Sequence, residues 1–172
     1  MACALTQGYV IDCRDSVGGI KTAYIIELDN ITTFATASGV VTGITKVTGK
    51  RFWKYNLEHN TANAKNDYTA SRENGTFFNA QTVSIVLNKM QASVRNEIKL
   101  IAQNKLAVII EDKNGAVWLF GKDNGLMLSG GGSDSGTAMG DRSGYTVTLT
   151  GEEKEECLSV LSTLLTSLET PG

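Results

Sequence analysis

The chain contains 172 residues with a mass of 18.4 kDa, which fits one domain that buries a single core. Hydrophobic residues at 41% and charged residues at 20% exclude a disordered chain. The formal net charge of -2 disfavours a nucleic-acid reader, because such proteins gain affinity from Lys and Arg that neutralise phosphates. No run approaches the roughly 18 apolar residues that span a bilayer, so we expect no membrane anchor and no secretion.

Short strand patterns fill the first third of the sequence. In residues 18–28 the even positions form one apolar face, whereas Lys21 and Glu27 lie on the other. Further β-type runs follow at residues 31–36, 40–47 and 51–57. In the last of these runs, Trp53 and Tyr55 alternate with polar residues, which predicts one buried face and one wet face.

The strand pattern then breaks over residues 58–76, where Tyr68 is the one large apolar side chain. We expect a long polar loop here, and loops of this length inside compact domains are usually functional. Charges of both signs beside an aromatic ring suit a polar contact between subunits. The candidate inter-subunit contact residues are Lys65, Asp67, Tyr68, Arg72 and Glu73. We expect the loop to be mobile in a free subunit and ordered against a neighbour.

The middle of the chain combines strands with one helix. An alternating run at residues 77–87 predicts a strand. Apolar side chains then recur at helical spacing over residues 89–103, which predicts a helix. Residues 106–110 are apolar throughout, so we expect a strand covered on both faces, one of them by that helix. An Asn-Gly pair favours a tight turn into a returning strand at 116–120, and a short strand follows at 126–128.

The last part of the chain begins with a Gly/Ser-rich stretch over residues 129–144, where we expect a flexible loop. Tyr145, Val147 and Leu149 then alternate with threonines and predict a strand over residues 145–150. Apolar residues recur at helical spacing after this strand, at Leu158, Leu161, Leu165 and Leu168. They predict a C-terminal helix, with a continued strand as the alternative.

No motif in the sequence has the pattern of a phosphate or calcium site. The glycines between residues 130 and 140 lack the Gly-Lys-Ser/Thr sequence of a phosphate-binding loop. Four aspartates lie in Asn/Gly-rich segments without the spaced acidic ligands of a calcium loop: Asp112, Asp123, Asp134 and Asp141. We interpret these aspartates as turn formers.

Nucleophilic catalysis has no better support. His59 lies in the polar stretch, and no pattern brings a nucleophile to it, so a solvated surface histidine is the simpler interpretation. Cys3, Cys13 and Cys157 are expected as reduced, half-buried thiols. We therefore expect a non-enzymatic protein with no catalytic residue, no metal and no cofactor.

Four segments occur in an order that resembles virion structural proteins of tailed bacteriophages infecting Bacteroidetes-type gut bacteria, crAss-like phages among them. They are residues 13–21 (CRDSVGGIK), 95–100 (RNEIKL), 114–121 (NGAVWLFG) and 135–151, which begins SGTAMGD and ends GYTVTLTG. The resemblance covers about residues 1–153 and fades in the Leu-rich C-terminal segment. It implies a tail-tube-like fold, a β-sandwich or partly rolled barrel with one packed helix, and it transfers no catalytic residue.

Together these observations predict a mainly β (α+β) protein with a single structural domain over residues 1–172. The resemblance implies a tail tube subunit that forms homo-oligomeric rings, expected as hexamers, and that contacts other virion tail proteins. DNA would pass through the rings without specific binding, and the protein would be made in the host cytoplasm and used in the virion. A neck, terminator or tail-barrel ring protein is the near alternative. A carbohydrate- or cell-surface-binding β-sandwich is the rival from another class, and it predicts a monomer.

Overall fold

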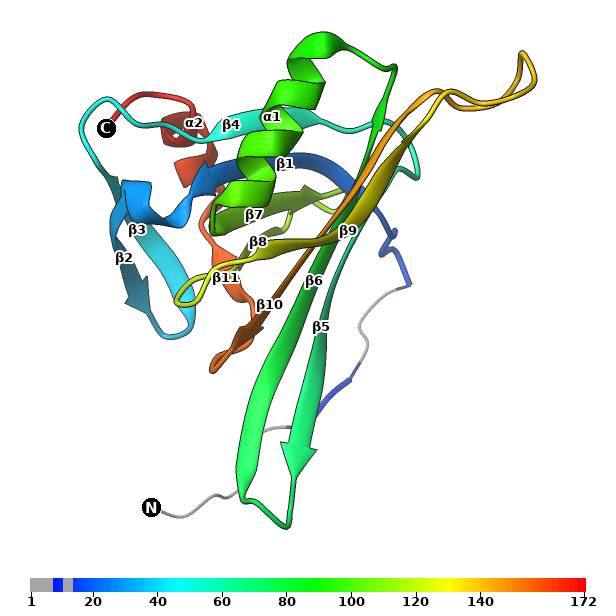
Figure 1. Cartoon of the computed structure of the whole chain (residues 1–172). Helices are drawn as coiled ribbons and strands as arrows, with labels where there is room; N and C mark the ends of the chain where they lie inside the picture. Colours follow the sequence, from blue (N-terminus) through cyan, green and yellow to red (C-terminus); the bar gives the residue numbers. More distant parts are fainter. Residues whose placement is uncertain (1–7, 11–13) are drawn as a thin grey trace.

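The computed structural model describes residues 8–10 and 14–172 (Figure 1). Strands make up 51% and helices 14% of the structure, so the expected mainly β fold is confirmed. The strands are β1 (Ile20–Glu27), β2 (Ile31–Ala37), β3 (Val40–Lys46), β4 (Trp53–Asn56), β5 (Ala62–Ser71), β6 (Thr76–Asn88), β7 (Leu106–Asp112), β8 (Val117–Phe120), β9 (Met127–Asp134), β10 (Gly144–Glu153) and β11 (Leu158–Val160). The helices are α1 (Ala92–Gln103) and α2 (Leu165–Leu168), with single 3-10 turns at η1 (Leu28–Asn30) and η2 (Ser162–Leu164).

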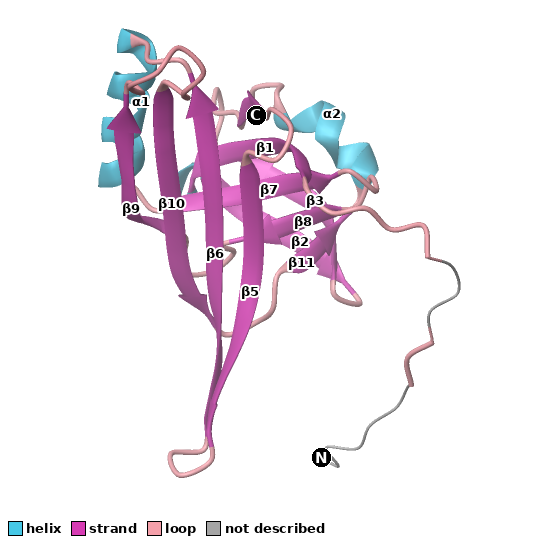
Figure 2. Cartoon of the chain, turned by 90° about the vertical axis from the view of Figure 1, so that its right-hand side faces the viewer, coloured by secondary structure: helices cyan, strands magenta, loops and turns pink. Residues whose placement is uncertain are grey.

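The strands form two sheets. One has seven strands in the order β2-β3-β11-β8-β7-β1-β4, and the other has four in the order β5-β6-β10-β9. Figure 2 shows the four-stranded sheet face on, with α1 beside β9 and the seven-stranded sheet behind it. All pairs within the four-stranded sheet are antiparallel, so its strands alternate in direction from one edge to the other.

The central strands of the larger sheet are buried on both faces. In β1, Ala23 and Ile25 belong to a core cluster shared with the four-stranded sheet and α1. Tyr24 and Ile26 belong to a second cluster, which Phe52 and Leu168 help to close on the opposite face. β1 is therefore confirmed as a strand, but its odd positions Ala23 and Ile25 are buried as well as its even ones, because a second layer from segments distant in the chain covers the other face.

The polar segment over residues 58–76 is not a loop, and that expectation is wrong. Its residues form β5, which pairs with β6 from Ala62 opposite Ile85 to Ser71 opposite Thr76. A strand is possible with so few apolar residues because β5 is an edge strand with small Ala62 and Ala64 facing the core. The long β5–β6 hairpin extends past the rest of the fold (Figure 1), where both of its faces meet water.

The Gly-rich segment over residues 129–144 was also wrongly expected to be a loop throughout. Its first part continues β9 to Asp134, and β10 begins at Gly144. Glycine suits β9 because Gly131 has a φ of 152°, and a Cβ there would lie 2.2 Å from the Thr146 carbonyl oxygen. Only residues 135–143 form the expected loop.

The middle helix is confirmed as α1, whose buried Ile101 faces the first core cluster. The expected C-terminal helix is largely wrong. β10 continues to Glu153, β11 contains Leu158, and helical structure returns only over residues 162–168, where η2 runs into α2. The helical spacing of the leucines gave a wrong prediction because these residues are buried by different partners: Leu158 pairs with Leu119 in the sheet, and Leu168 belongs to the second cluster. The alternative of continued strand structure holds as far as Val160.

Candidate functional site

The five candidate contact residues all lie on the β5–β6 hairpin. Lys65, Asp67 and Tyr68 belong to β5, while Arg72 and Glu73 lie in the exposed turn at the hairpin tip. The structure thus places all five on one hairpin, as strand and turn residues rather than in a loop: Lys65 and Asp67 lie within the four-stranded sheet, Tyr68 lies where β10 ends, and Arg72 and Glu73 project beyond it. The composition was informative about exposure and uninformative about secondary structure.

Lys65 and Asp67 face the same side of β5. The Lys65 Nζ lies 2.6 Å from an Asp67 carboxylate oxygen, and both side chains are 55% exposed. An ion pair in water contributes up to about 1 kcal/mol. The pair therefore matters chiefly because it neutralises two charges on the outer face of the four-stranded sheet.

Tyr68 lies on the opposite face of β5 and stacks on Phe77 of β6, with ring centroids 6.2 Å apart. The two side chains are 61% and 57% exposed. The Tyr68 hydroxyl donates a hydrogen bond to the Glu156 carboxylate, which raises the pKa of Tyr68. The inner flank of the hairpin therefore presents a stacked aromatic pair that stays more than half exposed.

Buried amides fix the base of the hairpin to the body of the protein. The Asn66 side-chain amide donates to Asn79 Oδ1 at 3.0 Å, and the Asn79 amide donates to the Lys154 carbonyl at 3.2 Å. The Gly121 backbone N–H donates to Gln81 Oε1 at 2.8 Å. Because Asn79 and Gln81 are almost completely buried, these bonds set the direction in which the hairpin projects.

Glu153, at the end of β10, is a buried carboxylate; its spacing from Thr150 is that of a helix capping box, but both residues lie in a strand. Its Oε1 accepts hydrogen bonds from the backbone N–H groups of Asp123, Asn124 and Gly125 at 3.2, 2.9 and 3.1 Å. Burial raises the pKa of Glu153, and these backbone bonds oppose the rise. Glu153 therefore holds the turn between β8 and β9 in place and so positions β9.

The outer face of the four-stranded sheet is polar and nearly uncharged. The rows across β5, β6, β10 and β9 read Asn63, Ser84, Thr148, Gly130 and Lys65, Thr82, Thr150, Met127. Ionisable side chains on this face are Lys65, Asp67, Glu152, Asp134 and Arg142; the first two pair with each other, and Arg142 donates a hydrogen bond to Thr146 Oγ1 at 3.1 Å. The face is therefore lined mainly by hydroxyl, amide and small side chains.

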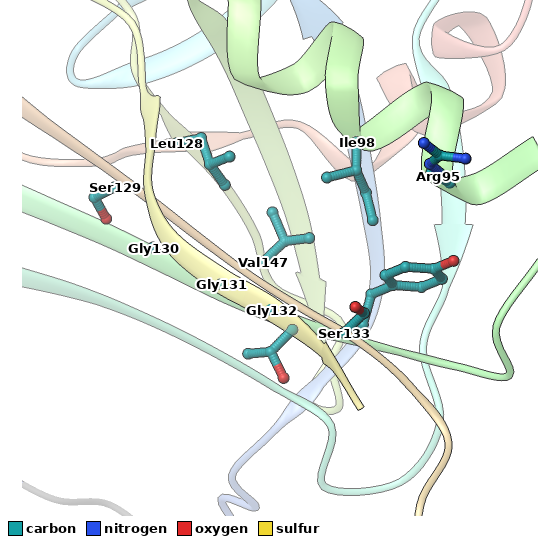
Figure 3. A pocket seen from close by; sticks show the side chains of 11 residues that line it. Arg95, Ile98, Leu128, Ser129, Gly130, Gly131, Gly132, Ser133 and Val147 are labelled. Atoms are coloured by element: carbon teal, nitrogen blue, oxygen red, sulfur yellow. The ribbon is translucent and has the colours of Figure 1, made fainter. Parts of the chain in front are cut away.

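Both edges of this sheet stand over a cleft that leads toward the core. At the β9 edge, a cavity of about 420 Å³ lies between β9, β10 and α1 and has Ile98, Leu128 and Val147 in its wall (Figure 3). At the β5 edge, a cavity of about 640 Å³ lies between β5 and the larger sheet. Its wall mixes Ala62, Ala64 and Phe120 with amides and carboxylates.

The remaining candidates have structural or surface roles. Asp112, Asp134 and Asp141 each accept hydrogen bonds from backbone N–H groups in turns, as interpreted from the sequence. His59 is exposed in the turn before β5. Burial raises the pKa of the half-buried Cys157 thiol, while Cys3 and Cys13 lie outside the described residues.

Among residues 8–10 and 14–172, no three His, Cys, Asp or Glu side chains come together as metal ligands would. In the same ranges, none of the helices has the length and apolar character needed to cross a membrane. No protein-family model matches the chain, and comparisons with curated proteins and with solved structures found no match.

Proposed function

We propose that this protein is a structural subunit of a phage tail tube, in which copies join head to tail into rings that stack around a DNA channel. The observation that supports this proposal best is the four-stranded sheet, which combines two free edges with a polar, nearly uncharged outer face. The sequence resemblance to virion structural proteins points in the same direction. A single neck or terminator ring would use the same subunit contacts without stacking.

The strand directions suit ring closure. The sheet has four strands of alternating direction, so β5 and β9 run antiparallel to each other at its two edges. When β9 of one copy lies beside β5 of the next, the pair is again antiparallel, and the alternation continues around the ring. A closed ring then pairs every exposed edge of this sheet, which a free subunit leaves unpaired.

The outer face suits a channel that DNA slides through. Affinity for duplex DNA comes mainly from cations that neutralise phosphates. A face of hydroxyls and amides whose one lysine is paired with Asp67 should therefore bind DNA weakly. The face also lacks the aromatic platforms that hold single strands, apart from half-buried Phe78 near the hairpin tip.

The β5 edge allows a selective test. The Val86 N–H donates to the Thr61 carbonyl, so in the register of this pair the N–H of Ala64 points away from β6. Ala64→Pro should therefore spare the bonds to β6 but block pairing with a neighbouring β9. Ala64→Ser keeps the N–H and serves as the matched control.

We expect wild-type protein and Ala64→Ser to form rings or tubes in negative-stain electron microscopy at high concentration, and Ala64→Pro to stay monomeric with an unchanged circular dichroism spectrum. Normal assembly of Ala64→Pro would overturn the edge-pairing model. A wild-type protein that stays strictly monomeric by light scattering would overturn the ring proposal itself and favour a surface-binding module.

A further inference from the structure

The cavity at the β9 edge is an apolar pocket that the subunit cannot fill itself. Ile98 of α1 and Leu128 of β9 form its sides and Val147 of β10 forms its floor (Figure 3), and Tyr145 of β10 also lines it. β9 contributes glycines beside this floor, and Gly131 pairs directly with Val147. Since a Cβ at Gly131 would lie 2.2 Å from the Thr146 oxygen, no larger residue at this position of β9 can close the gap. A group from another segment can fill it.

The N-terminal arm offers apolar side chains with no place in the fold. Tyr9 and Val10 are 86% and 84% exposed. The arm is held where it joins the body: the Val17 N–H donates to Asn114 Oδ1 at 2.9 Å, and the Asn114 amide donates to the Val17 carbonyl at 2.7 Å. Val17 is therefore fixed to the body of the protein.

The arm and the pocket lie on opposite sides of the subunit. Figure 2 shows the described arm residues beyond β5, whereas α1 and the pocket lie at β9. Between the two sides the sheets enclose the first core cluster, which leaves no passage for the arm beneath its own sheet. In a head-to-tail ring, however, the neighbour's β9 would lie about 4.8 Å from β5. Residues 10–17 span roughly 26 Å when extended, which is ample for that reach.

We propose that Tyr9 and Val10 of one copy occupy the pocket between α1 and β9 of the adjacent copy. This inference rests on the proposed head-to-tail ring. A pocket of about 420 Å³ accommodates an aromatic ring, since engineered apolar cavities of about 150 Å³ already bind benzene. Arg95, which has no ion pair within the described residues, lies at the pocket wall and can place its guanidinium over the Tyr9 ring.

The competing site for the arm is the cleft at the subunit's own β5 edge, since Gly18 and Gly19 line it. That cleft suits Tyr9 and Val10 less well, because Asn60, Asn63 and Asn66 form much of its wall and would be desolvated against apolar groups. The β9 pocket has the more apolar wall and is the better match.

Disulfide trapping tests the location of the arm. In a background with Cys3, Cys13 and Cys157 replaced by Ser, Tyr9→Cys combined with Leu128→Cys should give a ladder of covalent multimers after oxidation of assembled protein. The same pair should give no multimers in dilute monomer, and Tyr9→Cys with Ala64→Cys should not cross-link within one subunit. An efficient Tyr9–Ala64 cross-link within the monomer would overturn the proposal.

A substitution that leaves the fold untouched tests the energetics. Tyr9→Ala with Val10→Ala removes only exposed side chains, and we expect the concentration needed for assembly to rise at least about tenfold. Tyr9→Phe keeps the ring and should assemble like the wild type. If the wild type assembles but the double-alanine variant matches it, the arm inference fails while the ring proposal stands. If the wild type does not assemble at all, the ring proposal fails first.

Discussion

Tyr68 and Phe77 stack on each other with an interplanar angle of 18°, yet both rings remain more than half exposed on a hairpin that leaves the body of the protein. An aromatic pair in this position contributes little to the core, because only one flank of each ring is covered. Its placement at the end of the four-stranded sheet suits a contact with the next ring in a stack.

Shortening the hairpin should separate folding from stacking. Replacing residues 70–77 with Asn-Gly joins Thr69 to its hydrogen-bonded cross-strand partner Phe78 through a tight turn, removes Phe77 and removes no residue of either core cluster. We expect an unchanged melting temperature, single rings and no tubes in electron microscopy. Tubes of normal length from this variant would show that the hairpin tip plays no part in stacking.

Glu153→Ala should destabilise the subunit by about 2–4 kcal/mol, because backbone N–H groups in the β8–β9 turn lose their buried acceptor. Urea unfolding monitored by circular dichroism measures the loss. The exposed neighbour Glu152 supplies the control, and Glu152→Ala should stay within about 0.5 kcal/mol of the wild type. Equal effects of the two substitutions would contradict the role of Glu153 in holding the turn.

The raised pKa of Glu153 also predicts a pH dependence. The folded state binds the Glu153 proton more tightly than the unfolded state, so this group stabilises the fold below its unfolded pKa and loses that contribution as pH rises through its folded pKa. The unfolding free energy of the wild type relative to Glu153→Gln should therefore increase as pH falls from about 7 to about 4.5. The comparison with Glu153→Gln cancels other carboxylates, such as Asp141, whose pKa is lowered by backbone hydrogen bonds and whose contribution falls in acid. A constant difference across this range would contradict the prediction.

Neighbouring glycines of β9 should respond differently to alanine. Gly131→Ala places a Cβ 2.2 Å from the Thr146 oxygen at a φ of 152°, whereas a Cβ at Gly132 meets nothing within 4 Å. We expect Gly131→Ala to lose more than about 2 kcal/mol and Gly132→Ala to stay within about 0.5 kcal/mol of the wild type. Thermal unfolding of the two variants checks the contrast. Similar melting temperatures would show that β9 adjusts easily and that its pocket is not rigid.

Duplex DNA should not bind the wild-type protein appreciably, even in a gel shift at low salt, because the outer sheet face is nearly uncharged. Thr82→Lys with Thr148→Lys adds two cations to that face and should create binding that weakens steeply with salt. The same two lysines at Thr33 and Thr36 of exposed β2 provide a charge-matched control on the other sheet. Tight, salt-sensitive binding by the wild type would contradict a conduit role.

The sequence alone determined the strands whose pattern is local. β1, β2, β3, β4, β6, β7, β8 and β10 were all predicted near their observed positions, and so was α1. Most of them show a period of two or of 3.6 residues, or a continuous apolar run, because burial is repeated along the element itself, whereas β2 and β3 were predicted from β-forming residues between turn residues. Composition likewise indicated which segment would be exposed, and the five candidate contact residues do lie on the β5–β6 hairpin with exposed side chains.

Only the tertiary structure decided the roles of β5, β9 and the C-terminal segment. β5 is a strand because β6 pairs along its whole length, although Ala62 and Ala64 are its only apolar residues toward the core. β9 is a strand because β10 pairs with it along its length. Glycine is needed at Gly131 because β10 approaches closely there. The leucines after Glu153 divide between a sheet and a second core cluster. In all three places the stabilising partner is distant in the chain, so the local sequence shows no periodic pattern from which the element could be predicted.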